Sequence, residues 1–125
     1  MSKYRTLIID DEEPARLRLR QLLAEQAGII TIVGEATNGI EAIQQIQLLK
    51  PDLIFLDIQM PGKDGFQVIQ SLNEVPYIIF CTAFDHYALQ AFETNSIDYL
   101  VKPVKPERLA IALKKVQNLT SKSDN

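Results

Sequence analysis

The 125-residue sequence has no tryptophan, one cysteine and one histidine. A single cysteine cannot form an internal disulfide, and so few cysteine and histidine side chains exclude a zinc site built from them. No apolar run approaches the roughly 18 residues of a membrane helix. The N-terminal stretch Met-Ser-Lys-Tyr-Arg leads directly into an apolar run and leaves no room for a signal peptide. We therefore expect a cytoplasmic protein with no membrane segment.

An excess of positive charge is also absent. The 16 acidic residues outnumber the 13 lysine and arginine residues, and the formal net charge is −3. Because binding to a nucleic-acid backbone needs a basic face, we assign no nucleic-acid contact to this chain. Arg16, Arg18 and Arg20 lie close together, but residues two apart on a helix diverge, so we expect a solvated face there.

Short apolar runs alternate with amphipathic stretches along the whole chain. The apolar runs predict strands at about residues 4–9, 30–36, 53–56, 77–81 and 99–101. The length suits one domain, which should bury roughly two-thirds of its unfolded surface. We place this domain in residues 1–120. The polar, unpatterned residues 121–125 are expected to be the start of a linker or a disordered tail.

The amphipathic stretches predict five helices. Their expected positions are about 14–26, from the N-cap Asn38 to Pro51, around Phe66–Leu72, about 87–94, and from Pro106 onward. The fourth helix is the weakest, with mainly Ala88, Ala91 and Phe92 to bury. The single cysteine, Cys81, lies inside an apolar run and is expected to be a small core side chain.

This alternation predicts an α/β fold, (βα)5, with a doubly wound five-stranded parallel sheet. The first, third and fourth runs are apolar at successive positions, which is typical of strands covered by helices on both faces. Right-handed crossovers favour the strand order 2-1-3-4-5. That order places the first and third strands side by side at the reversal point of the sheet, beyond whose carboxyl ends ligands bind.

Chemically active side chains follow four of the predicted strands. Asp10 and Asp11 close the first run, Asp57 the third, Thr82 the fourth and Lys102 the fifth. Since all carboxyl ends of parallel strands share one edge, we expect these side chains to meet there. Three neighbouring carboxylates repel one another unless a cation joins them, and Mg²⁺ takes oxygen ligands of this kind. The alternative is an acidic strand end that is merely solvated.

A carboxylate is also a nucleophile toward phosphorus, and its attack gives an acyl phosphate. Asp57 is the better nucleophile candidate because it stands alone on a central strand. Asp10 and Asp11 are the better metal holders because one turn can aim both inward. Lys102 would neutralise charge on a phosphoryl group, and the Thr82 hydroxyl would hydrogen-bond one of its oxygens.

These motifs, in this order and at this spacing, resemble a bacterial two-component response-regulator receiver domain over essentially the whole chain. The segments that carry the resemblance are Leu7-Ile-Ile-Asp-Asp-Glu-Glu13, Leu53-Ile-Phe-Leu-Asp-Ile-Gln-Met-Pro-Gly62, Asp64-Gly65, Thr82-Ala83 and Lys102-Pro103. The resemblance implies a flavodoxin-like fold and a phosphoryl group transferred to Asp57 from a sensor histidine kinase. It also implies that Asp10, Asp11, Asp57 and the backbone carbonyl of Gln59 hold Mg²⁺.

The same resemblance implies a switch. Thr82 and Lys102 would contact the phosphoryl group, and Tyr99 matches the aromatic residue that swings inward when Thr82 is drawn to the phosphate. The Lys102-Pro103 bond matches a bond that is cis in the family, although an unaided X-Pro bond is cis only about 5–6% of the time. The residues at the positions of Gln59 and Phe84 influence how fast the acyl phosphate hydrolyses in receivers, and we hypothesise that Phe84 limits the approach of water.

The segment from Thr82 to Pro103 looks like the narrower LytR/AlgR (LytTR) branch, whose members carry a C-terminal LytTR DNA-binding domain. No such domain lies within these 125 residues, so any DNA contact would belong to a part outside them. We hypothesise a homodimer through the surface of the fourth helix, fifth strand and last helix. The single histidine, His86, is expected to be a solvated loop residue and not a phosphorelay histidine.

Three other functions compete with this interpretation. An aspartyl-phosphate phosphatase of the haloacid dehalogenase kind needs a second acid two residues after the nucleophile, where Gln59 stands. A receiver-like interaction module would never become phosphorylated. A nucleotide-binding sheet needs a glycine-rich loop after the first strand, which has Asp-Asp-Glu-Glu-Pro instead. We expect no enzyme activity beyond self-catalysed phosphorylation and dephosphorylation.

Overall fold

Five short strands form one parallel sheet in this computed structural model, which describes residues 3–123 and the side chains of residues 3–120. The strands are β1 (Tyr4–Ile9), β2 (Ile30–Ala36), β3 (Leu53–Leu56), β4 (Tyr77–Thr82) and β5 (Asp98–Val101). Their order is β2-β1-β3-β4-β5, and every neighbouring pair is parallel. The predicted fold class and strand order are therefore confirmed.

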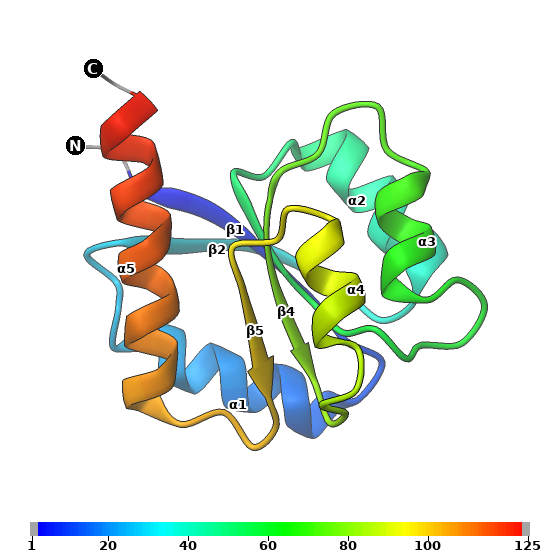
Figure 1. Cartoon of the computed structure of the whole chain (residues 1–125), viewed down its shortest axis with the longest axis horizontal. Coiled ribbons are helices and arrows are strands. Elements are labelled where there is room, and N and C mark those ends of the chain that lie inside the picture. The colour runs from blue at the N-terminus through cyan, green and yellow to red at the C-terminus, as the bar shows by residue number, and fades with distance from the viewer. Residues whose placement is uncertain (1–2, 124–125) are drawn as a thin grey trace.

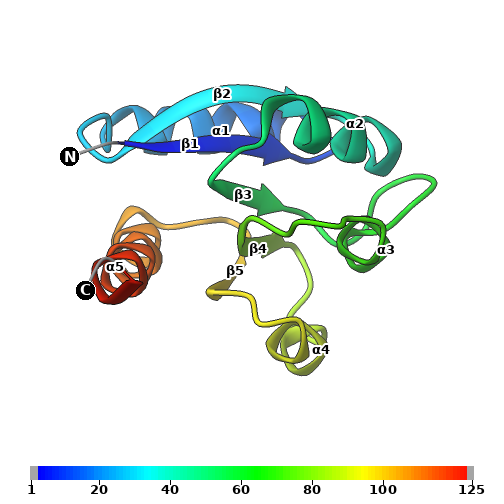
Figure 2. The same cartoon turned by 90° about the horizontal axis from the view of Figure 1, so that it is seen from above.

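Five helices connect the strands and cover both faces of the sheet. They are α1 (Glu13–Ala24), α2 (Gly39–Leu49), α3 (Gly65–Gln70), α4 (Ala88–Glu93) and α5 (Pro106–Ser123). Figures 1 and 2 show α1 and α5 together on one side of the strands and α2, α3 and α4 on the other. Within residues 3–123, none of these helices is both long and apolar enough to span a bilayer.

Each face of the sheet builds its own hydrophobic core, because successive side chains of a strand point to opposite faces. Ile8 and Phe55 belong to the core beneath α1 and α5, whereas Leu7, Ile54 and Leu56 belong to the core beneath α2, α3 and α4. All four residues of β3 are buried, as expected for a central strand covered on both sides. Cys81 is buried in the first core, as predicted, and burial raises the pKa of its thiol to about 12.

The ends of the helices follow recognisable capping rules. The Asn38 side chain accepts a hydrogen bond from the Glu41 amide at 2.8 Å, which confirms the predicted N-cap of α2. Asp64 caps α3 in a reciprocal arrangement with Gln67, a capping box that the sequence prediction missed. Helix α5 runs to Ser123, and residues 124 and 125 lie outside the described residues. The start of a linker or disordered tail at residues 121–125 stays a prediction.

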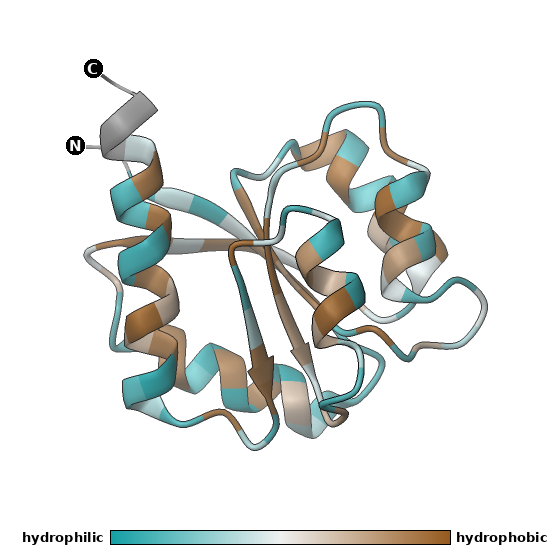
Figure 3. Cartoon of the chain, viewed as in Figure 1, coloured by the Kyte–Doolittle hydropathy of each residue, from teal (hydrophilic) through white to brown (hydrophobic). Residues whose placement is uncertain are grey.

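The fourth helix departs from the expectation. Only Ala91 is buried in α4, whereas Ala88 is exposed and Phe92 has 78% of its surface exposed. The prediction that Ala88 and Phe92 are buried is therefore wrong. The helix has only six residues, so a single inward position satisfies its contact with the sheet. By contrast, Figure 3 shows hydrophobic and hydrophilic residues alternating along α5, whose Leu109, Ala112 and Leu113 are buried as predicted.

Candidate functional site

Three aspartates meet at the carboxyl edge of the sheet. The backbone amide of Asp10 donates to Ala36 at the end of β2, and that of Asp57 donates to Ile9 at the end of β1. These bonds continue the sheet one residue beyond its strands and set both acids side by side. Asp10 is 1% exposed and Asp57 is 5% exposed, while Asp11 is exposed. One carboxylate oxygen from each lies within 4.8 Å of the others.

A glycine allows the following loop to pack against the acid on β3. The Gly65 amide, at the start of α3, donates to the carbonyl of Ile58 at 2.8 Å. A Cβ at position 65 would lie 2.6 Å from the carbonyl oxygen of Asp57, too close for any side chain. The Asp64-Gly65 pair therefore closes the loop tightly over the end of β3.

Lys102 follows β5 and reaches across to two of the acids. Its Nζ lies 2.6 Å from Asp10 Oδ2 and donates to Asp57 Oδ2 at 3.2 Å. Burial alone would lower the pKa of Lys102, but its contacts with Asp10 and Asp57 outweigh that effect and raise it. The ammonium therefore stays charged beside the two buried carboxylates. The Lys102-Pro103 bond is cis, as the family resemblance implied.

Asp57 remains an energetically costly anion despite its partners. Burial raises the pKa of its carboxyl, Lys102 lowers it in part, and the neighbouring charge of Asp10 raises it again. Its two oxygens are held in different ways, since Oδ1 accepts from the Ile58 amide at 2.7 Å and Oδ2 accepts from Lys102. An added cation would relieve the remaining repulsion.

Thr82 ends β4 with a hydroxyl that is buried and unused. The residue is 0% exposed, and its Oγ1 has no hydrogen-bond partner among the residues that the structure describes. Buried hydroxyls in folded proteins are nearly always hydrogen-bonded, so this one calls for an explanation. Its position on the strand next to β3 fits a donor reserved for a group bound at Asp57.

The donor set fits a hard divalent cation. Carboxylate oxygens alone, without sulfur or imidazole, match the preference of Mg²⁺. Asp11 and Gln59 also line a shallow depression of about 520 Å³ that continues along the loop toward Asp64. The predicted ligand role of the Gln59 backbone carbonyl stays a prediction.

Tyr99 on β5 lies half-buried against the second core. Its ring centroid is 6.4 Å from that of Phe80, and its hydroxyl donates to the backbone carbonyl of Phe84 in the β4–α4 loop. Burial raises the pKa of this phenol. Tyr99 thus links β5 to the loop that follows Thr82, a contact that the sequence analysis did not foresee. Phe84 itself is partly exposed beside His86, which is exposed as predicted.

Of the three arginines on α1, Arg18 is exposed as predicted, whereas Arg16 and Arg20 are partly buried and paired with an acid. Arg16 donates to Glu35 on β2 at 3.1 Å and to the backbone carbonyl of Asp10 at 2.8 Å. Arg20 donates to both carboxylate oxygens of Glu35 at 2.6 and 2.7 Å. The prediction failed because Arg16 and Arg20 lie one helical turn apart and both face Glu35. The signal was Glu35, the single charged residue in the strand Ile30–Ala36.

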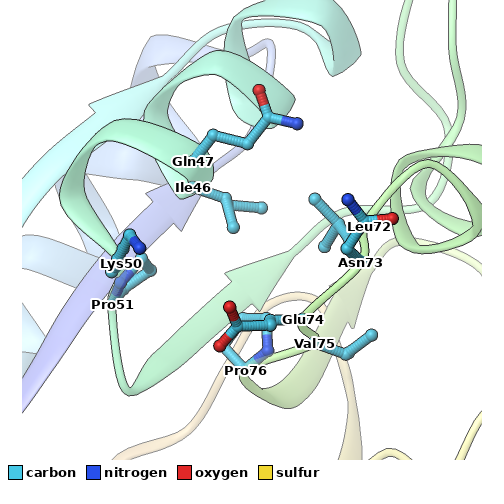
Figure 4. Close-up of a pocket in the computed structure, with 9 residues that line it drawn as sticks. All are labelled: Ile46, Gln47, Lys50, Pro51, Leu72, Asn73, Glu74, Val75 and Pro76. Carbon is cyan, nitrogen blue, oxygen red and sulfur yellow. The ribbon is translucent and has the colours of Figure 1, made fainter.

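A second cavity lies far from the acids. It has a volume of about 470 Å³ and is formed by the end of α2 and the loop before β4, as Figure 4 shows. Lys50, Pro51 and Pro76 line it at the entrances to β3 and β4, opposite the edge that carries Asp57. It therefore has no part in the chemistry at the carboxyl edge.

Comparison with known proteins identifies the family of this chain. Residues 6–114 match the family model described as the response regulator receiver domain. The sequence is 51% identical over 112 residues to the positive alginate biosynthesis regulatory protein of Pseudomonas aeruginosa, with 87% of this chain and 45% of that protein covered. It is 46% identical over 122 residues to the transcriptional regulatory protein BtsR of Escherichia coli, with 96% and 51% covered.

A solved structure agrees with these matches. The chain is similar to the REC domain of AraT, a response regulator from Geobacillus stearothermophilus, with a TM-score of 0.89 and 29% identity over 99% of this chain and 100% of that one. The chain spans about half the length of the curated relatives that it matches. With the family model, the relatives and the solved fold in agreement, the chain belongs to the receiver domains of two-component response regulators.

Proposed function

We propose that this domain accepts a phosphoryl group on Asp57 from a sensor histidine kinase, in a reaction that requires Mg²⁺. The observation that carries the proposal is the convergence of three carboxylates, the Lys102 ammonium and the unpartnered Thr82 hydroxyl at one edge of the sheet. Of the two buried acids, Asp57 is the acceptor because it follows the central strand β3, next to the strand that ends in Thr82, and is oriented by the Ile58 amide and Lys102.

The transfer proceeds by attack of a carboxylate oxygen on phosphorus. The new bond joins an Asp57 oxygen to phosphorus, while the bond from phosphorus to the donor's histidine nitrogen breaks and its electron pair stays on that nitrogen. Phosphoryl transfer depends mainly on positioning and charge neutralisation. Lys102 lies 3.2 Å from Asp57 Oδ2 and is placed to move toward a phosphoryl oxygen. The Thr82 hydroxyl is placed to donate to another.

Asp10, Asp11 and Asp57, with the backbone carbonyl of Gln59, would hold the metal. When bound, Mg²⁺ neutralises charge on the carboxylates and on the phosphoryl oxygens. Asp10 is already fixed for this role, because its Oδ1 accepts from the Glu12 amide at 3.0 Å and its backbone carbonyl accepts from Arg16. In this proposal the domain is a phosphoacceptor that catalyses its own modification and does not turn over a separate substrate.

Phosphorylation then biases a two-state conformational equilibrium. Thr82 is drawn toward the phosphoryl group, and Tyr99 responds because its hydroxyl contacts the loop that follows Thr82. The surface of α4, β5 and α5 carries exposed Leu89, Phe92, Val101 and Ile111. We propose that this surface forms a homodimer on phosphorylation. Sedimentation with and without a beryllofluoride mimic tests this, and an unchanged monomer at tens of micromolar would contradict it.

The name of a longer relative suggests what such a receiver domain controls. BtsR is named a transcriptional regulatory protein, and this chain matches about half of it. We propose that this domain belongs to the LytTR branch and controls transcription through a LytTR DNA-binding domain in another part of the protein, without touching DNA itself. A cytoplasmic location is part of the same proposal. Expression of the full-length protein with DNA-binding assays would test it.

Phe84 is proposed to lengthen the life of the acyl phosphate. It stands two residues after Thr82, is partly exposed, and contacts the rings of His86 and Tyr87. A large apolar side chain there would obstruct the approach of water. The decay of phospho-Asp57 should be faster in Phe84→Ala than in the wild type, and equal lifetimes would contradict this role.

A direct experiment tests the main proposal. Incubation with Mg²⁺ and acetyl phosphate should add the mass of one phosphoryl group, as measured by intact-protein mass spectrometry. Asp57→Ala should abolish the gain, whereas Glu25→Gln, which alters an exposed acid at the end of α1, should not. A gain that persists in Asp57→Ala would refute the assignment. Turnover of a generic phosphate ester would favour the phosphatase alternative instead.

A further inference from the structure

Two loops that rise from neighbouring strands are joined by one hydrogen bond. Gln59 Nε2, in the β3–α3 loop, donates to the hydroxyl of Tyr87, in the β4–α4 loop, at 2.8 Å. β3 and β4 are paired, with Leu56 opposite Phe80. Asp57 and Thr82 lie at the adjacent ends of these two strands, so the bond joins the two loops that begin just beyond them.

The tyrosine that accepts this bond is firmly placed. Its ring centroid lies 4.1 Å from that of His86, 6.1 Å from that of Phe66 and 6.3 Å from that of Phe84. Tyr87 itself is half-buried, and a tyrosine loses little conformational entropy when it is held in this way. Ring contacts therefore hold Tyr87 in place, and its hydroxyl restrains the flexible side chain of Gln59.

The restrained amide belongs to the residue two places after the phosphoryl acceptor. Hydrolysis of phospho-Asp57 requires a water oxygen to bond to phosphorus as the bond from phosphorus to the Asp57 oxygen breaks. The carboxylate keeps the electron pair, and a proton of the water passes to solvent. An amide free to move near Asp57 would hydrogen-bond such a water and orient it. An amide bonded to Tyr87 would instead lie between the two loops and obstruct the approach of such a water.

We propose that Tyr87 is a positioning residue that holds the Gln59 amide across the mouth of the site and so prolongs the life of phospho-Asp57. The inference rests on the proposed phosphorylation of Asp57 and adds a means of setting its duration. Loss of the bond should speed hydrolysis in two ways. It uncovers the approach of water to phospho-Asp57, and it frees the amide to orient that water. The effect of Tyr87 therefore passes through Gln59.

The decisive variant is Tyr87→Phe, which keeps the ring contacts and removes only the hydroxyl. Phosphorylated by acetyl phosphate and freed of the donor, it should lose its phosphoryl group roughly fivefold faster than the wild type, which corresponds to about 1 kcal/mol of activation free energy. Tyr77→Phe, which alters a tyrosine at the opposite end of β4, is the matched control and should decay like the wild type.

A second background shows whether the effect passes through Gln59. Gln59→Met has a side chain of similar length without the amide, so adding Tyr87→Phe to it should leave the decay rate unchanged. Equal effects of Tyr87→Phe in both backgrounds would overturn the inference, as would wild-type decay in the single variant. No phosphoryl gain in the wild type would instead overturn the proposed function and this inference with it. Melting temperatures of all variants identify any change that comes from misfolding.

Discussion

The helix that follows Asp10 and Asp11 and the helix that follows Thr82 are anchored to the sheet in different ways. α1 buries Leu19, Leu22 and Leu23 beneath the sheet, whereas α4 buries only Ala91. α1 is also tied by Arg16 and Arg20 to Glu35 on β2. The loop before α4 is held by neutral contacts alone: hydrogen bonds from the Tyr99 hydroxyl and from Gln59, and the packing of the Tyr87 ring against the second core.

This difference in anchoring fits two separate requirements, a fixed binding site and a segment that can move. The side that carries Asp10 and Asp11 keeps its geometry because apolar burial and ion pairs act together. On the side that carries Thr82 and Tyr99, α4 has one buried side chain and no ion pair among the described residues, so a small change of contacts at the phosphoryl group would be enough to move that helix. A receiver needs both properties at once: a rigid place to bind and a nearby segment to displace.

Truncation of a leucine on each helix should reveal the largest difference in stability between α1 and α4. Leu23→Ala, at a site that is 1% exposed, is expected to lower the free energy of unfolding by about 2–5 kcal/mol through lost burial and a cavity. Leu89→Ala on α4, at a site that is 75% exposed, should change it by about 0.5 kcal/mol or less. Urea unfolding measures both, and equal losses would remove the contrast between the two helices.

Magnesium binding should stabilise the acidic side. If the dissociation constant is about 1 mM, then 10 mM Mg²⁺ should add roughly 1.4 kcal/mol to the free energy of unfolding. Asp11→Asn should abolish the rise in melting temperature, while Glu25→Gln, the same change of charge at an exposed acid on α1's end, should preserve it. An unchanged melting temperature of the wild type would contradict the metal site.

The ion pairs of α1 make a smaller contribution. Arg16→Ala removes donors to Glu35 and to the Asp10 carbonyl and should cost about 1 kcal/mol of stability, with weaker Mg²⁺ binding. Arg18→Ala, which removes one donor to the Val104 carbonyl from an exposed side chain, is the matched control. Calorimetric titration of Mg²⁺ with both variants checks this, and equal affinities would deny Arg16 a role at Asp10.

A pH titration should separate two carboxylates of opposite behaviour. Burial alone would raise the pKa of Asp98 on β5, but hydrogen bonds from Arg108, the Tyr99 amide and Lys115 outweigh it and lower the pKa. Asp98 thus contributes stability above its ordinary pKa of about 4, and this contribution is lost as the pH falls through the lower folded value. Asp57, whose pKa is raised, weakens the fold once it ionises, and that penalty disappears as the pH falls.

Two substitutions turn these signs into a measurement. At neutral pH and without Mg²⁺, Asp98→Asn should destabilise the protein. Asp57→Asn should stabilise it by about 1 kcal/mol, because it removes a buried negative charge next to Asp10. Guanidinium unfolding between about pH 3 and pH 7 would show both trends. Destabilisation by Asp57→Asn as well would mean that Asp57 carries no electrostatic penalty.

Most of the fold was predictable because burial leaves a periodic signal. The runs around Ile8 and Phe55 predicted central strands, and parallel topology then brought Asp57 and Lys102 together from 45 residues apart. The contacts that were missed involve long polar side chains that pair across elements, such as Arg16 with Glu35 and Gln59 with Tyr87. Such pairs depend on orientation in space, which no spacing along the chain reveals.

The most direct test of the account is to locate the modified residue chemically. After incubation with acetyl phosphate, borohydride reduction converts an acyl phosphate to an alcohol, so an aspartyl phosphate becomes homoserine. Peptide mass spectrometry should then find homoserine at position 57 alone, in samples that contain Mg²⁺ and not in samples treated with a chelator. Homoserine at another acid, or equal conversion of Asp57 without the metal, would contradict the account.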